Sequence, residues 1–296
     1  MRNLKLALFA GAALAAAFTS AHAADLGPIM QPRQMAPVQV EEMGGWYLRG
    51  DIGVGAQRFK EFDFHQTNVG TGGAWPADWR IDQRDIKDAF FIGGGVGYQW
   101  NSWLRFDATG EYRSDVKFKA VGSYTNFPNP ALGRAFDVYD GDHSALVFLA
   151  NGYVDLGTWF CLTPFVGAGV GAVYHRTAAV SDMGINNNGL GSSAFGFASS
   201  DQTNWNFAWA LHAGVAYNVT NNFKMELAYR YLNMGSANTA EVQCGANGCG
   251  GVGGGPRAYY TLRDMDSHDI KFGMRWMLQP EQQQQPAYMP PLMRKG

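Results

Sequence analysis

The stretch from Leu104 to Phe118 alternates between two kinds of side chain. Apolar or small residues occupy every second position with one exception, and the positions between them are charged except for one threonine. Successive strand side chains point to opposite faces, so this period of two separates an apolar face from a charged one. A helix, with about 3.6 residues per turn, would spread the same charges around its surface. The alternation predicts that Val116 and Phe118 face outward, and that Asp115 and Lys117 face inward.

The run is longer than the usual strand of about 5–6 residues. A long strand with one apolar and one ionic face is typical of a barrel wall that has lipid outside and a polar interior. A soluble barrel of the lipocalin kind would turn its apolar residues inward instead. The other face of this strand is too charged to form a dry core, so we assign the apolar face to lipid.

A targeting segment opens the chain. A short basic region (Arg2 and Lys5) precedes an apolar run over 6–18, and an A-x-A cleavage motif follows at 21–23. The apolar run is shorter than the roughly 20 residues that a spanning helix needs. We therefore predict a secretory signal peptide over 1–23.

Composition narrows the class of protein further. The formal net charge of −2 gives no basic excess that would indicate a nucleic-acid partner. Beyond residue 18 no apolar run approaches the length of a spanning helix, which leaves strands as the means of crossing a membrane. Aromatic residues make up 14% of the chain and there are 38 glycines, as suits interfacial aromatic girdles and tight strand packing.

Eight segments carry the alternating pattern. We predict strands over 46–59, 89–100, 104–118, 144–156, 159–176, 204–218, 223–231 and 267–278. Long polar connections (60–87, 120–142, 177–203 and 233–266) alternate with short turns. This predicts an all-β fold: an eight-stranded antiparallel up-and-down transmembrane β-barrel with four long external loops.

The predicted organisation has four parts. The signal peptide is followed by a flexible, proline-containing periplasmic segment over 24–44. The outer-membrane barrel covers 45–278, and a Pro/Gln-rich tail over 279–296 is expected to be disordered.

Charged side chains on the inward faces form a candidate lumen network. Its members are Arg49, Asp51, Arg105, Asp107, Glu111, Arg113, Asp155, Lys224, Glu226, Arg230, Asp269, Lys271 and Arg275. An eight-stranded barrel is just wide enough for its own side chains to fill, and unpaired buried charge is strongly unfavourable. We therefore expect a plugged, ion-paired interior, with a narrow diffusion path as the alternative.

Two further sets follow from position along the strands. Aromatic residues near the short turns are expected to form a periplasmic girdle: Trp46, Tyr98, Trp100, Trp103, Trp159, Tyr217 and Phe223. The glycine runs at 93–97 and 167–171 lie inside strands, so they do not form a phosphate-binding loop, which needs a following helix. We interpret their inward glycines as space for bulky interior side chains.

Three segments carry a resemblance to a known family. They are RFDATGEYR at 105–113, LTPFVGAGVG at 162–171 and ELAYRY at 226–231. They resemble the small outer-membrane β-barrel family of alphaproteobacteria, the Brucella-type major surface-antigen or porin-like family, which is itself similar to OmpA-type barrels. The resemblance implies a Gram-negative outer-membrane location and a structural surface role in the cell envelope, with narrow porin activity. Barrels of this family usually end on an aromatic residue. This chain departs from that pattern, because Met277, Leu278 and the tail follow Trp276.

The resemblance also implies an alternative function, a surface receptor or adhesin that binds a ligand such as haemin through its external loops. His65 and His143, both predicted in loops, would be the haem ligands under that hypothesis. The implied partners are outer-membrane lipid, lipopolysaccharide and, during insertion, the barrel-assembly machinery. The oligomeric state stays open.

No catalytic or metal-binding set is found in register. His175 and His212 are expected to be hydrogen-bonded lumen side chains, so the chain is predicted not to be an enzyme and to need no cofactor or metal. Cys244 and Cys249 lie in an exported glycine-rich loop, which predicts a disulfide between them. Cys161 is left over and is expected to be a buried thiol.

Overall fold

A computed structural model describes residues 44–68, 77–125, 131, 133–185, 193–244 and 257–278, which form twelve strands. The strands are β1 (Gly45–Arg58), β2 (Glu61–Asn68), β3 (Arg80–Ile86), β4 (Ala89–Gln99), β5 (Leu104–Thr125), β6 (Arg134–Asp155), β7 (Leu162–Ile185), β8 (Ser193–Ala198), β9 (Gln202–Asn218), β10 (Phe223–Asn238), β11 (Val242–Cys244) and β12 (Arg257–Met277). No helix among the described residues is long and apolar enough to cross a membrane.

Eight strands close a ring in the order β1, β4, β5, β6, β7, β9, β10 and β12, and β12 pairs back to β1. Every neighbouring pair in the ring is antiparallel. The predicted fold class, an eight-stranded antiparallel barrel, is confirmed. The short connections β4–β5, β6–β7 and β9–β10 define one end of the ring, which we call the short-turn end.

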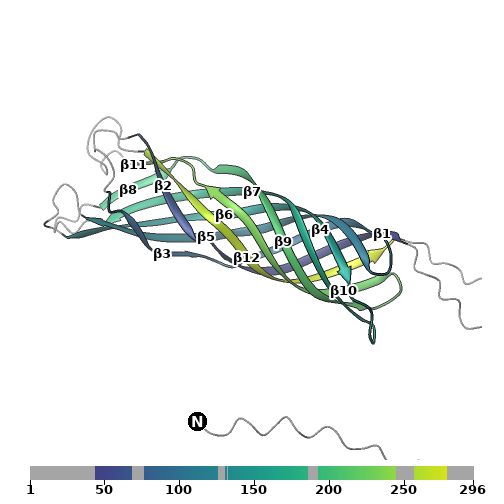
Figure 1. Cartoon of the computed structure of the whole chain (residues 1–296). Helices are drawn as coiled ribbons and strands as arrows, with labels where there is room; N and C mark the ends of the chain where they lie inside the picture. The colour runs from purple at the N-terminus through teal and green to yellow at the C-terminus, as the bar shows by residue number, and fades with distance from the viewer. Residues whose placement is uncertain are drawn as a thin grey trace, which may run out of the picture. The chain divides into compact units, whose positions relative to one another are not determined.

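The four remaining strands extend the opposite end, which we call the outer end (Figure 1). Here β2 pairs with β12, β3 with β5, β8 with β7, and β11 with both β8 and β12. The prediction of four long loops is therefore wrong over much of their length. For example, β5 continues to Thr125, β6 begins at Arg134, and β12 begins at Arg257, all within predicted loops.

Near the short-turn end, the ring is apolar outside and charged inside. Leu48, Ile52 and Val54 on β1 are exposed, whereas Arg49 and Asp51 between them are buried. The same outward exposure holds for Phe106 and Tyr112 on β5, Leu146 and Phe148 on β6, Val166 and Val170 on β7, Leu211 and Val215 on β9, Leu227 on β10, and Ile270, Phe272 and Met274 on β12. A continuous outward apolar band with a polar interior fits a wall that lies in hydrocarbon.

Beyond this band the polarity of the wall inverts. Val116 and Phe118 are 8% and 0% exposed, while Lys117 points outward with 63% of its side chain exposed. The predicted side-chain directions of Val116, Phe118 and Lys117 are therefore wrong. The β5–β6 register shifts between Arg113 and Val116, and such a bulge moves every following side chain to the opposite face.

Three other ring strands change phase as well, whereas β6 and β9 keep one phase along their length. The switch occurs around Ala179 on β7 (φ +51°), Gly235 on β10 (φ +71°) and Asp264 on β12 (φ +51°). The buried apolar cluster that results, the outer core, includes Phe59, Phe62, Val116, Phe118, Tyr139, Val180, Leu232, Met234, Tyr260, Leu262 and Met265. Burial of apolar side chains is favoured where water surrounds a segment, so an inversion of this kind is expected where a barrel wall leaves the lipid. Phe136, Met183, Ile185 and Phe197 nevertheless stay exposed at the outer end.

Aromatic side chains in the interior lie directly opposite glycines on the neighbouring strand. Tyr47 is paired with Gly97, and Tyr153 is paired with Gly167. A Cβ atom added at either glycine would overlap the facing ring. The interpretation of these two glycines as space for bulky side chains is confirmed.

This packing gives a first prediction. Gly97→Ala is expected to destabilise the barrel by about 1–3 kcal/mol, because the new methyl group overpacks the Tyr47 ring. Gly50→Ala is the matched control, since a Cβ there meets no atom within 4 Å. Urea unfolding of the two refolded variants in detergent would measure the difference. Equal midpoints would mean that the ring moves aside at no free-energy cost.

Candidate functional site

The interior charges are the candidate functional site. Apart from Lys224, every member of the predicted lumen network is at most 7% exposed. Lys224 lies on β10 near the short-turn end and is half-buried. The residues come from β1, β5, β6, β10 and β12, whose period-two alternation directs them to one interior space.

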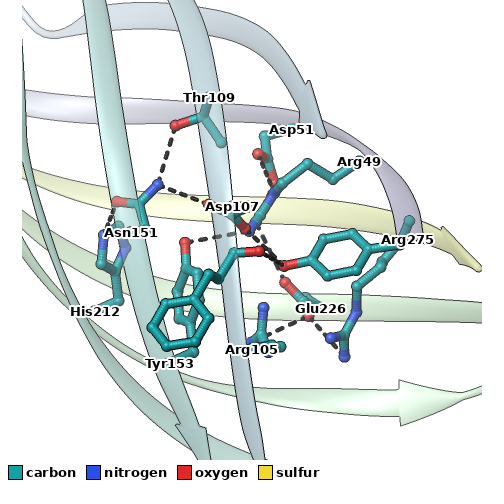
Figure 2. Close-up of polar contacts among 12 residues, drawn as sticks. Arg49, Asp51, Arg105, Asp107, Thr109, Asn151, Tyr153, His212, Glu226 and Arg275 are labelled. Carbon is teal, nitrogen blue, oxygen red and sulfur yellow. Dashed lines mark hydrogen bonds and ion pairs between the residues drawn. The ribbon is translucent and has the colours of Figure 1, made fainter. Parts of the chain in front are cut away.

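A lower layer of charges is centred on Glu226. This carboxylate lies 3.3 Å from Arg49 Nη2, 3.4 Å from Arg105 Nη2 and 3.2 Å from Arg275 Nη2. Figure 2 shows these side chains converging from four strands. Three guanidinium groups thus share one carboxylate, and each has a further acceptor.

Those further acceptors complete the lower layer. Arg49 also contacts Asp51 at 2.9 Å and Asp107 at 2.5 Å, and Arg105 contacts Asp155 at 3.1 Å. Additional contacts in this layer are Lys271 Nζ to Asp51 at 3.5 Å, Arg275 Nη1 to Gln99 Oε1 at 3.1 Å, and Tyr47 Oη to Asp107 Oδ2 at 3.1 Å. The Arg105 guanidinium lies over the Tyr153 ring, 4.0 Å from its centroid, so the layer is packed as well as paired.

An upper layer is centred on Asp269, which is fully buried. Its carboxylate accepts hydrogen bonds from Arg113 Nη1 at 3.0 Å and Nη2 at 2.8 Å, and from Arg230 Nε at 2.8 Å. Glu111 accepts from the same two arginines at 3.1 and 2.8 Å. Two carboxylates and two guanidiniums thus form a charge-balanced square, and such charge-assisted bonds hold the strands in fixed positions.

Neutral amide and imidazole groups extend the network sideways. Asn151 Nδ2 donates to Asp107 Oδ1 at 2.8 Å and to Thr109 Oγ1 at 3.1 Å, while its Oδ1 lies 3.2 Å from His212 Nε2 (Figure 2). His212 pairs across the sheet with Arg230. Its role here is to complete the hydrogen bonds of Asn151.

A histidine pair lies above the upper layer. His175 Nε2 is 2.9 Å from the Met234 carbonyl oxygen, which only accepts, so this nitrogen carries a proton. The Nδ1 atom of a neutral His175 must then accept from His143 Nε2, 2.9 Å away. The prediction of His143 in an external loop is wrong, because it lies on β6 and is 1% exposed.

Four successive groups of buried side chains occupy the interior in the described part of the barrel. The two ionic layers are followed by the histidine pair and then by the outer core, where Phe118, Leu232 and Met234 are fully buried. A solute would have to displace ion-paired arginines and then an apolar core.

The other predicted site residues are placed as follows. At the short-turn end, Trp46, Trp100, Trp103, Trp159 and Tyr217 are exposed, and Tyr98 and Phe223 are partly so. Cys161 is exposed in the β6–β7 turn, so the prediction of a buried thiol is wrong. A hairpin turn projects its side chains into solvent, which the strand-based assignment overlooked.

Some predictions fall outside the described residues. The signal peptide, residues 24–43, the tail and Cys249 all do, so the Cys244–Cys249 disulfide also stays a prediction. His65 is half-buried on β2 and stacks on Tyr259, with ring centroids 4.7 Å apart. Among the described residues, no group of three or more His, Cys, Asp or Glu side chains is placed to hold a metal ion.

Sequence reasoning missed several interior contributors. Tyr47, Phe91, Tyr153 and Gln99 are buried beside the charges, and Trp276 belongs with the exposed aromatics of the short-turn end. A signal was present, because Tyr47 is in phase with Arg49, and Tyr153 with Asp155. The glycines opposite Tyr47 and Tyr153 were the second signal.

Comparisons with known proteins agree with this architecture. A family model described as "Outer membrane protein beta-barrel domain" matches residues 10–248. An uncharacterized protein of Brucella suis biovar 1 is 34% identical over 245 residues, which cover 74% of this chain and 78% of that protein. A putative adhesin of Rickettsia canadensis is 29% identical over 197 residues, covering 67% of this chain and 75% of the adhesin.

Two solved structures are similar to this chain at low sequence identity. Neisserial surface protein A has a TM-score of 0.42 at 16% identity, and the match covers 80% of this chain and 99% of that structure. The outer membrane protein OprG of Pseudomonas aeruginosa has a TM-score of 0.45 at 13% identity, with 80% and 98% covered.

Proposed function

Because this chain belongs to the outer membrane protein β-barrel family, we propose that it is a closed surface barrel with a structural role in the envelope. The protein lies in the outer membrane of a Gram-negative cell. Its short-turn end then faces the periplasm, and its outer end with β2, β3, β8 and β11 projects from the cell surface.

The observation that carries the proposal is the ion-paired interior with a buried apolar cluster above it. Six of the interior positive charges each lie within 4 Å of a carboxylate (Arg49, Arg105, Arg113, Arg230, Lys271 and Arg275). Breaking such pairs leaves buried charge without compensation, so the layers resist rearrangement. The outer core adds a second, apolar closure above them. Narrow porin activity therefore finds less support than a structural role.

Single-channel conductance in a planar bilayer tests the proposal. We expect refolded wild-type protein to give no discrete current steps, and Arg113→Ala to stay silent because the outer core still closes the barrel. Lys117→Ala, an outward substitution on the same strand, is the matched control. Wild-type steps that change with Arg113→Ala but not with Lys117→Ala would establish a conducting lumen and contradict the closed barrel.

The proposal is non-enzymatic. The buried histidines have other partners: His212 contacts the Asn151 amide, and His175 contacts His143 and the Met234 carbonyl. Both ring nitrogens of His175 are used in this way, and the remaining Nδ1 atoms of His143 and His212 are buried inside the barrel, out of reach of a substrate in solution.

The alternative role of receptor or adhesin stays a prediction. Haemin binding through the external loops loses one of its two predicted ligands, since His143 is buried between strands. The name "putative adhesin" belongs to the Rickettsia relatives. We further propose outer-membrane lipid and lipopolysaccharide as partners of the apolar band, and the barrel-assembly machinery as the partner during insertion.

A further inference from the structure

Two carboxylates face each other inside the part of the barrel that projects from the membrane. Asp137 lies on β6 opposite Gly184, and Asp182 lies on β7 opposite Tyr139. They are thus diagonal cross-strand neighbours on the inner face, a relation that places Cα atoms about 7–8 Å apart. Both lie beyond the level at which the wall inverts.

Tyrosines are the hydrogen-bond partners of this pair. Tyr139 Oη donates to Asp137 Oδ2 at 3.2 Å, and Tyr260 Oη donates to Asp182 Oδ2 at 2.6 Å. Trp79 Nε1 donates to Tyr139 Oη at 3.1 Å. Because Trp79 immediately precedes β3, a chain of hydrogen bonds connects the Asp137 carboxylate to the start of that strand.

The surrounding elements supply no compensating cation among the described residues. From β5, Tyr124 faces Asp137, and from β6, Arg134 is turned to Ser123 and Asp78. On β3, Asp82 interacts with Arg80 and Ser123. The other described elements place beside the pair no side chain that ionises between about pH 4 and about pH 8. Their nearby residues are Phe62 and Phe64 on β2, Gly196 on β8, Val242 on β11 and Tyr260 on β12.

This environment disfavours two negative charges at once. Burial raises the pKa of Asp137 to about 6. Burial, together with the neighbouring Asp137 charge, raises the pKa of Asp182 to about 7. Burial also raises the pKa of Tyr139 and Tyr260, so both hydroxyls keep their protons and act as donors.

We propose that the Asp137–Asp182 pair is an acid-operated latch that holds the projecting part of the barrel closed. With a proton on the pair, one carboxyl is neutral and the contacts to Tyr139, Tyr260 and Trp79 hold β3, β6, β7 and β12 together. With both carboxylates charged, repulsion and the need for hydration favour opening of this region. The inference goes beyond the structural role, since it assigns a regulated state to the exposed end.

The direction of the pH dependence follows from proton binding. The closed state binds protons more tightly than an opened, hydrated state, in which carboxyl pKa values return to about 4. Closure is therefore fully favoured below about pH 4. It is lost as the pH rises through about 6 to about 7. Each additional bound proton changes the opening equilibrium by at most about tenfold per pH unit.

Hydrogen–deuterium exchange of the full chain in detergent micelles tests the latch. Protection factors, which remove the intrinsic pH dependence of exchange, are compared at pH 5 and pH 8 for segments 134–140, 181–185 and 257–263. We expect wild-type protection to fall by about tenfold or more at pH 8. Asp137→Asn/Asp182→Asn should be equally protected at both pH values, because neutral amides replace the titrating groups.

The control is Asp142→Asn, an outward residue of β6 that pairs with Lys117, and it should keep the wild-type pH dependence. Heat-modifiable gel mobility establishes that each variant is folded. If the double variant does not fold, Asp182→Asn alone should lose the part of the dependence above about pH 6. Wild-type protection that is equal at both pH values, or a dependence that survives in the double variant, overturns the latch.

Discussion

Replacing Asp269 with alanine is expected to lower the free energy of unfolding by about 3–5 kcal/mol. The Asp269 carboxylate is fully buried and accepts from Arg113 and Arg230. Without it, both guanidiniums share Glu111 alone, and Ser267 Oγ loses the acceptor 2.5 Å away. The loss is large because a buried charge is left without compensation, rather than because the pair itself is strong.

Urea unfolding of the refolded barrel, followed by tryptophan fluorescence, would measure this change. Asp115→Ala is the matched control, since Asp115 lies on the outward face of β5 and pairs with the exposed Arg176 at 3.6 Å. Its loss should be at most about 1 kcal/mol. If the two variants lose the same free energy, the lumen network does not stabilise the barrel.

Phe118→Ala is expected to cost about 3–5 kcal/mol, because the ring is fully buried in the outer core. Phe106→Ala offers a comparison within one strand, since Phe106 is 46% exposed on the lipid-facing side of β5. The lipid-facing substitution should cost less, as its ring has fewer protein neighbours to lose. The contrast tests the bulge between Arg113 and Val116 directly.

The two variants are compared by urea unfolding and by hydrogen exchange of 116–122, which reports local opening of β5 beyond the bulge. Under the uninterrupted alternation of the sequence, both rings would face lipid and the two losses would be similar. Similar losses would therefore contradict the inverted wall. A larger loss for Phe118→Ala locates the level at which the lipid ends.

Much of the fold follows from the local sequence pattern of this chain. The alternation of 104–113 gave the correct inward side chains for β5, and the spacing of short turns gave the eight-strand ring. The reason is geometric, because a period of two depends only on the strand itself. Inward placement of the lumen charges followed from the same rule, without knowledge of their partners.

The partners were beyond the reach of the sequence. That Glu226 would meet three arginines from β1, β5 and β12 depends on the register and closure of the ring. Likewise, Asp137 and Asp182 lie 45 positions apart along the chain and become neighbours only through the β6–β7 register.

The bulges account for the largest differences between the predicted and the observed side-chain directions. One inserted residue reverses the facing of all later side chains, and the single break in the alternation at Ser114 does not by itself reveal an inserted residue. The expected loops at 120–142 and 233–266 proved to be largely strands, because their apolar residues turn inward where water replaces lipid. Local alternation thus determined which residues share a face between two bulges, and the charges on one face indicated that this face lies inside. Only the closed barrel, whose register contains the bulges, decided where along a strand the two faces exchange.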